Sequence, residues 1–256
     1  PLYSSAASDV YKRQPTPSHI VEAAKKALDQ GYTRYTANKG YIELRQSIAR
    51  KLLEENKIEA DPETEIIVTV GAMQAISMGI LVTINLGDEV IIPNPGYESF
   101  DRQVKFAGGI PVYVNLREEK QGLRLVPEDV EKAINKKTKM IILNSPTNPT
   151  GNVMSKSDLE AIAELTKRHD LLVLTDEIYE KIVYDDARHY SVGSFPRMED
   201  RTISVFGFSK TYAMTGWRVG YAVACTHIVD EMTKIQEFYV TSATSISQRA
   251  AIAALD

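Results

Sequence analysis

Short runs of β-branched and other apolar residues recur along the chain and alternate with segments of helical periodicity. The runs predict strands at 66–70, 89–93, 110–116, 140–144, 171–176, 202–206 and 219–223. In MIILN (140–144) and LLVLT (171–175) the apolar residues are continuous rather than alternating, which indicates strands covered on both faces. Strands that alternate with helices build an α/β domain around a largely parallel sheet.

Helix signals fill the intervals between these runs. Thr16 is a candidate N-cap, Pro17 suits the first helical turn, and Gly31 marks the helix end. Ser155 and Asp158 have the spacing of a capping box that opens another helix. Further helices are predicted at 41–52 and 74–84.

Composition narrows the possible partners. The 256 residues include 30 Lys and Arg against 34 Asp and Glu, a net charge of −4, which argues against nucleic acid and against an anionic membrane surface as partners. No apolar run approaches the roughly 18–20 residues of a membrane span. A single cysteine, Cys225, excludes a disulfide scaffold and a thiolate metal cluster and favours a reducing compartment. We therefore expect a cytoplasmic protein that acts on a small molecule.

The pattern also divides the chain. Residues 1–14 have neither helical nor strand periodicity, and we expect a foreign or disordered segment there. Residues 15–34 are interpreted as an N-terminal helix segment, and 35–256 as one large domain. Because Asp256 falls inside an apolar helical pattern, we expect this domain to be truncated at its C-terminal end.

In a parallel sheet the ligand binds beyond the carboxyl ends of the strands, so the residues after each run are the candidates. Gly71, Ala72 and Met73 open a helix and could bind an anion at its N-terminus, although taken alone an ordinary helix start is the favoured interpretation. Tyr97 could stack on a planar ring or simply pack. Asn148, in the rigid turn SPTNPTG, could present a fixed hydrogen-bonding group or only cap the turn.

Three charged residues complete this set. Asp176 ends a buried strand, where its pKa would rise unless a cation or hydrogen-bond donors hold it ionised; it could instead cap the next turn. Lys210 follows a strand in small and apolar surroundings that favour a nucleophilic amine, and Arg218 could grip an anion. Taken singly, an exposed lysine and a surface salt bridge are the better explanations of these two residues.

Several common active-site motifs are absent from the sequence. It contains no GxGxxG after a strand, no GxxxxGK[ST], no HExxH and no GxSxG. The four histidines lack the spacing of metal ligands and are best explained as surface or core residues. By contrast, a lysine, a deep aspartate and an anion site together are what pyridoxal 5′-phosphate requires for its aldehyde, its ring nitrogen and its phosphate.

From about residue 15 to 256 the sequence closely resembles class I aminotransferases of PLP fold type I, above all the aspartate and aromatic aminotransferases. The resemblance lies in YTANKGYIELR, VTVGAMQAI, PNPGYESF, NSPTNPTG, TDEIYEKIVY and FSKTYAMTGWRVGY. It implies a three-layer large domain with a mixed, mostly parallel seven-stranded sheet, and a small domain, formed by both chain ends, that is largely missing here. It also implies a homodimer that transfers an amino group between an amino acid and a 2-oxo acid by way of pyridoxamine phosphate.

The resemblance assigns a role to each matching residue. Lys210 would hold the cofactor and shuttle a proton, Asp176 would pair with the pyridinium nitrogen, and Tyr179 and Asn148 would hydrogen-bond the phenolic oxygen. Tyr97 would stack on the ring. The remaining assignments concern the phosphate, which would contact Gly71, Ala72, Met73, Ser209, Arg218 and, from the neighbouring subunit, Tyr35.

The sequence departs from the family pattern in ways that affect these expectations. Gly207 stands where many members carry a phosphate-binding serine, and Ser209 is at best a partial substitute. The N-terminal arm and the arginine that binds the substrate carboxylate would lie outside this sequence, so we expect poor turnover. Because a shared fold does not fix function, a PLP-dependent C–S lyase or eliminase, and the effector domain of a transcription regulator, remain alternatives.

Overall fold

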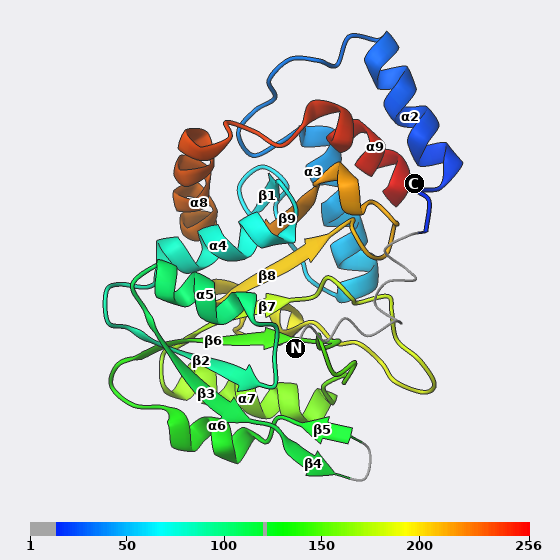
Figure 1. Cartoon of the computed structure of the whole chain (residues 1–256). Coiled ribbons are helices and arrows are strands. Elements are labelled where there is room, and N and C mark those ends of the chain that lie inside the picture. The colour runs from blue at the N-terminus through cyan, green and yellow to red at the C-terminus, as the bar shows by residue number, and fades with distance from the viewer. Residues whose placement is uncertain (1–13, 120–121) are drawn as a thin grey trace.

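The computed structural model describes residues 14–119 and 122–256, and the predicted foreign or disordered segment lies, apart from Gln14, outside these residues. A seven-stranded sheet with strand order β1-β9-β8-β7-β6-β2-β3 forms its centre (Figure 1). Each predicted strand is present within two residues of its expected bounds. The strands are β1 (Ile66–Thr69), β2 (Glu89–Asn94), β3 (Ile110–Asn115), β6 (Thr138–Asn144), β7 (Leu172–Asp176), β8 (Thr202–Gly207) and β9 (Gly220–Val223).

Strand direction is mixed because β9 runs opposite to both of its neighbours. β9 pairs antiparallel with β1 and β8, whereas the β8–β7, β7–β6, β6–β2 and β2–β3 pairs are parallel. The expectation of a mixed, mostly parallel seven-stranded sheet is confirmed. A separate hairpin joins β4 (Arg117–Glu119) and β5 (Gly122–Arg124).

Helices cover both faces of the sheet (Figure 1). On one face α4, α5 and α8 pack over the central strands, and on the other face α6 and α7 cover one half of the sheet while α2, α3 and α9 cover the other half. The bounds are α2 (Ser18–Asp29), α3 (Ile42–Lys51), α4 (Ala72–Thr83), α5 (Ser99–Phe106), α6 (Pro127–Ala133), α7 (Lys156–Arg168), α8 (Thr226–Tyr239) and α9 (Ser245–Leu255). Short helical turns lie at Leu52–Asn56, Val192–Ser194, Glu199–Arg201 and Thr215–Trp217.

Alternate side chains of the central strands enter different cores, because successive side chains of a strand point to opposite faces. In β6, Met140 and Ile142 join the core under α4, whereas Ile141 and Leu143 join the core under α7. In β7, Leu174 and Val173 divide in the same way. The continuous apolar runs therefore do mark strands buried on both faces.

The role predicted for Thr16 is wrong. The residue before α2 is Pro17, and no side chain caps this helix. The Thr16 hydroxyl instead donates to the carbonyl oxygen of Ala213 at 2.6 Å and accepts from Trp217 Nε1 at 2.9 Å. Its partners lie in the segment between Lys210 and Arg218, so Thr16 ties the start of α2 to the predicted site.

The predicted capping box is only half formed. Ser155 Oγ accepts from the Asp158 backbone N–H at 3.1 Å, as expected. The Asp158 carboxylate does not turn back to Ser155 but binds Arg124 through two hydrogen bonds, of 2.9 and 2.6 Å. A bidentate arginine is the stronger partner, so Asp158 links α7 to the β4–β5 hairpin.

Among the described residues no helix is long and apolar enough to cross a membrane.

We expect Leu174→Ala to destabilise the chain by about 2–5 kcal/mol, because the removed atoms leave a cavity between β7 and α4. Leu86→Ala is the matched control: Leu174 is 0% exposed and Leu86 is 90% exposed, so the control should change stability by less than about 0.5 kcal/mol. Urea denaturation measures both values. Equal losses for the two variants would contradict the packing described here.

Candidate active site

The predicted site residues gather at one edge of the sheet. β1, β2, β6, β7 and β8 all run in the same direction, so the segments that follow them emerge at their common carboxyl edge. β9 runs in the opposite direction. For that reason the residues that precede β9, rather than those that follow it, lie at this edge. Arg218 therefore comes to the same place as Gly71 and Lys210.

The groups expected to bind an anion come together where β1 meets α4. Gly71 precedes the first residue of α4 with φ +78°, a conformation that glycine adopts without strain. The first N–H groups of a helix have no partner within the helix and carry its positive dipole end. The Arg218 guanidinium lies against Gly71, since a Cβ placed there would be 2.5 Å from Arg218 Nη2. Backbone amides and a cation thus face one small space.

A second glycine, which the sequence analysis did not single out, makes this arrangement possible. A Cβ on Gly220 would lie 2.7 Å from the Ala72 nitrogen and 2.8 Å from the Gly71 carbonyl carbon. These contacts are to backbone, which cannot move aside, so the first residue of β9 must be glycine. The side chain of Met73, in contrast, is 37% exposed and approaches Gln103 Nε2 at 3.9 Å through its sulfur, so only its backbone amide is placed at the helix start.

Asp176 is the deepest charged residue of the site, with 5% of its surface exposed. The pKa of its carboxyl is raised to about 7, mainly by burial and to a smaller extent by the neighbouring Glu177, against the lowering effects of the Ile178 N–H and the Lys210 charge. Oδ1 accepts from the Ile178 N–H at 3.2 Å. The sequence-based expectation of a raised pKa is confirmed. The alternative, that Asp176 caps the turn after the strand, also holds, because its Oδ1 accepts from the backbone N–H of Ile178.

Lys210 and Tyr97 lie near this carboxylate, and Tyr179 lies near Lys210. Lys210 Nζ lies 5.8 Å from the centroid of the Tyr179 ring, and its charge acts on Asp176. Burial raises the pKa of Tyr97, and the Asp176 and Glu98 charges add to the effect. The Tyr97 ring packs edge-on against Phe100 at 5.6 Å. The packing interpretation of Tyr97 is confirmed by this contact, while its stacking on a planar ring stays a prediction.

Asn144, which the sequence analysis missed, holds the rigid turn that carries Asn148. Its Oδ1 accepts from the Asn148 N–H at 2.7 Å, and its Nδ2 donates to the Asp176 carbonyl oxygen at 2.9 Å. The Asn94–Pro95, Ser145–Pro146 and Asn148–Pro149 peptide bonds are cis. Asn144 was recognisable in the sequence as a polar residue that ends a continuous apolar strand. It fixes the position of Asn148 relative to Asp176.

Gly207 has a packing reason in this chain. A Cβ at this position would lie 2.6 Å from Ile178 Cδ1 and 3.6 Å from the Ala72 Cβ, so a serine here would force Ile178 to move. Ser209 and Lys210 are half-buried in the turn that follows β8. The strand end at 207 is thus shaped by its neighbours, and no hydroxyl fits there without repacking.

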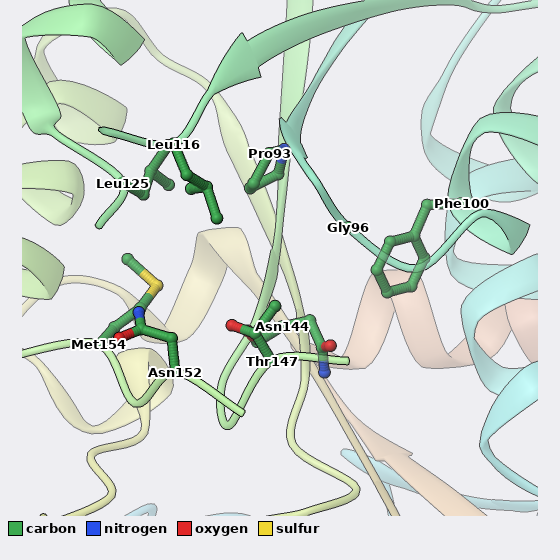
Figure 2. Close-up of a pocket in the computed structure, with 9 residues that line it drawn as sticks. All are labelled: Pro93, Gly96, Phe100, Leu116, Leu125, Asn144, Thr147, Asn152 and Met154. Carbon is green, nitrogen blue, oxygen red and sulfur yellow. The ribbon is translucent and has the colours of Figure 1, made fainter. Parts of the chain in front are cut away.

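A small apolar pocket lies beside the turn that follows β6, and not at Lys210 and Asp176. Figure 2 shows Leu116, Leu125 and Met154 on one side of it, with Asn144 and Thr147 below. Neither Lys210 nor Asp176 lines it. It borders the site through Asn144 and is distinct from the anion site.

Tyr35 stands apart from the other predicted residues. Its side chain is 84% exposed. The described residues form no group of three potential metal ligands among His, Cys, Asp and Glu.

Comparison with known proteins identifies the family. A model of the aminotransferase class I and II family matches residues 4–256. The chain belongs to this family, whose members depend in general on pyridoxal phosphate. An aspartate aminotransferase of Pyrococcus abyssi is 49% identical over 240 residues, which are 94% of this chain and 61% of that relative. An aromatic-amino-acid aminotransferase 2 of Thermococcus litoralis is 45% identical over 240 residues, with the same coverage of both chains.

Solved structures agree with this family assignment. The crystal structure of an aromatic aminotransferase from Pyrococcus horikoshii matches with a TM-score of 0.93 and 49% identity, over 95% of this chain and 65% of that one. An aspartate aminotransferase from Thermus thermophilus with maleate matches with a TM-score of 0.91 and 40% identity, over 95% of this chain and 62% of that one. The fold is that of fold type I aminotransferases, and the chain spans less than two thirds of the length of these relatives.

We expect Gly71→Ala to weaken pyridoxal phosphate binding about tenfold, because the added methyl group displaces the Arg218 guanidinium. Gly87→Ala is the matched control, since Gly87 has φ +86° and nothing within 4 Å of an added Cβ. It carries a similar backbone cost of about 1 kcal/mol without the collision. Fluorescence titration measures both affinities, and equal weakening in the two variants would speak against a role for Arg218.

The raised pKa of Asp176 makes the cofactor-free chain less stable as the pH rises. Below pH 3.8 the carboxyl is protonated in both the folded and the unfolded chain. Between pH 3.8 and about 7 only the unfolded chain ionises, so stability falls across this window, by on the order of 3 kcal/mol from pH 4 to 7.5. Urea denaturation at the two pH values should show this loss in the parent chain and a clearly smaller loss in Asp176→Asn. The exposed Asp186→Asn should behave as the parent does.

Proposed function

We propose that this chain is the cofactor-binding part of a pyridoxal-phosphate-dependent aminotransferase that moves an amino group between an amino acid and a 2-oxo acid. The observation that carries the proposal is the buried Asp176, whose pKa of about 7 marks a carboxylate in need of a cationic partner. A protonated pyridine nitrogen is such a partner, and its ion pair with Asp176 would favour the ionised carboxylate.

The anion site supports the same cofactor. The start of α4 offers unpaired backbone N–H groups, and Arg218 lies against Gly71 beside them. Together they provide hydrogen bonds and positive charge for a phosphate. Small residues at Gly71 and Ala72 leave the backbone accessible. Ser209 adds a hydroxyl in the turn next to Lys210.

The remaining residues have distinct tasks in this proposal. When bound, pyridoxal phosphate supplies an aldehyde that bonds to an amine and a ring that withdraws electrons. Lys210 provides the amine and afterwards carries a proton to and from the substrate Cα, because an amine next to charged and aromatic groups can act as a general base. Tyr179 and Asn148 donate hydrogen bonds to the phenolic oxygen, and Tyr97 covers one face of the ring.

The assembly and setting complete the proposal. We assign residues 15–34 to an N-terminal helix segment and 35–256 to the large domain. The exposed Tyr35, together with Phe238 and Tyr239 at the end of α8, supports a homodimer in which Tyr35 reaches the neighbouring phosphate. The single, half-buried Cys225 supports a reducing, cytoplasmic setting. The relatives' names make aspartate and aromatic amino acids the first donors to test.

We expect Lys210→Ala to abolish the yellow absorbance that pyridoxal phosphate acquires on covalent attachment, because Lys210 is proposed to supply the amine that attacks the aldehyde. After borohydride reduction, mass spectrometry of the parent chain should find the cofactor mass on the peptide that contains Lys210. The exposed Lys136→Ala is the control and should label as the parent does. Attachment elsewhere, or unchanged colour in Lys210→Ala, would refute the assignment.

The transfer itself is tested with single substrates. Addition of aspartate or an aromatic amino acid to the loaded chain, without a 2-oxo acid acceptor, should bleach the absorbance in one turnover and release one equivalent of the matching 2-oxo acid. Release of pyruvate and ammonia in repeated turnovers would favour an eliminase instead.

A further inference from the structure

A buried polar network lies behind the strand end that carries Asp176. Successive side chains of β7 point to opposite faces, so Asp176 lies on the α4 face with Leu174, whereas Thr175 and Glu177 lie on the opposite face. Glu177 is 3% exposed. Its partners are Thr175 of β7 and two residues of the segment 189–191, which follows β7 in the chain. None of these residues belongs to the proposed cofactor contacts.

The Glu177 carboxylate is fixed by three donors. Thr175 Oγ1 donates to Oε1 at 2.7 Å, and Ser191 Oγ and His189 Nε2 both approach Oε2, the latter at 2.7 Å. A carboxylate only accepts, so the hydrogen lies on His189 Nε2. Thr175 and Glu177 flank Asp176 in sequence. Their side-chain hydrogen bond therefore closes a loop across the reverse face that fixes the backbone of Asp176.

His189 is the cation-capable partner of Glu177 in this network. The nearby Lys51 is occupied elsewhere: it donates to Glu180 Oε1 and to Asn56 Oδ1, and lies 3.7 Å from Glu55. Asn56 Nδ2 in turn donates to Glu180 Oε2 at 2.7 Å. Among the described residues, His189 is the only Lys, Arg or His within salt-bridge distance of Glu177.

We propose that His189 is a positioning residue for Asp176, which acts through Glu177 and tightens the contact between Asp176 and the ring nitrogen of the cofactor. The inference rests on the proposed function. The hydrogen bond from His189 withdraws charge from Glu177, whose negative charge otherwise makes Asp176 hold its proton more strongly. It also completes the set of donors that holds the Thr175–Glu177 loop in place.

The test compares two ligands that differ only at the ring nitrogen: pyridoxal phosphate, and its carbocyclic analogue in which a C–H group replaces that nitrogen. In His189→Leu, affinity for pyridoxal phosphate should fall about tenfold, as for the loss of one hydrogen bond to a buried charge, while affinity for the analogue changes less than about twofold. His189→Gln keeps a donor in place of Nε2 and should restore most of the affinity. Fluorescence titration measures binding without any turnover.

The controls separate positioning from general stability. His169→Leu, at the exposed end of α7, should change neither affinity. If His189→Leu does not fold, Ser191→Ala removes a different donor to Glu177 and should give the same selective loss. Equal weakening for both ligands, or no weakening, would overturn the inference and leave the proposed function intact. A parent chain that binds neither ligand would instead contradict the proposed function.

Discussion

The site depends on a carboxylate that is buried before any ligand is bound. Asp176 lies at the end of β7 with 5% of its surface exposed, and burial alone makes its proton hard to remove. Such a group is costly unless a cation compensates for it. Lys210 supplies part of this compensation, and the ring nitrogen of the proposed cofactor supplies the rest. In this proposal, the elements at the carboxyl edge of the sheet serve to position one contact, that between Asp176 and the ring nitrogen of the cofactor.

At the phosphate end the decisive constraint is backbone proximity rather than side-chain chemistry. Gly220 lets β9 approach the turn between β1 and α4 so closely that any side chain there would collide with main-chain atoms. The reversed direction of β9 then delivers Arg218 to the same turn. The strand that makes the sheet mixed is thus also the one that brings the cation to the helix start.

The strands, and the sheet edge at which the site lies, could be predicted from the sequence, because continuous apolar runs and strand–helix alternation are local patterns. Contacts between residues distant in the chain could not be predicted in this way. Thr16 is a residue type that often caps helices, but its hydroxyl donates to the carbonyl oxygen of Ala213. No local rule could predict this distant partner. Asn144 and His189 likewise acquire their roles only from strand register and from the path of the chain after β7.

Successive side chains of a β-strand point to opposite faces, so a residue of the candidate site and the residues that hold it in place can be neighbours in sequence. Asp176 faces the candidate site, and its two sequence neighbours, Thr175 and Glu177, take part in the buried network on the opposite face. A change at 175, 177 or 189 can therefore alter the charge or position of Asp176 without touching the residues proposed to contact the cofactor. Because Asp176 and Glu177 are adjacent and both buried, the two faces are also electrostatically coupled, so a change in the charge of Glu177 on one face shifts the pKa of Asp176 on the other, where burial has the larger effect.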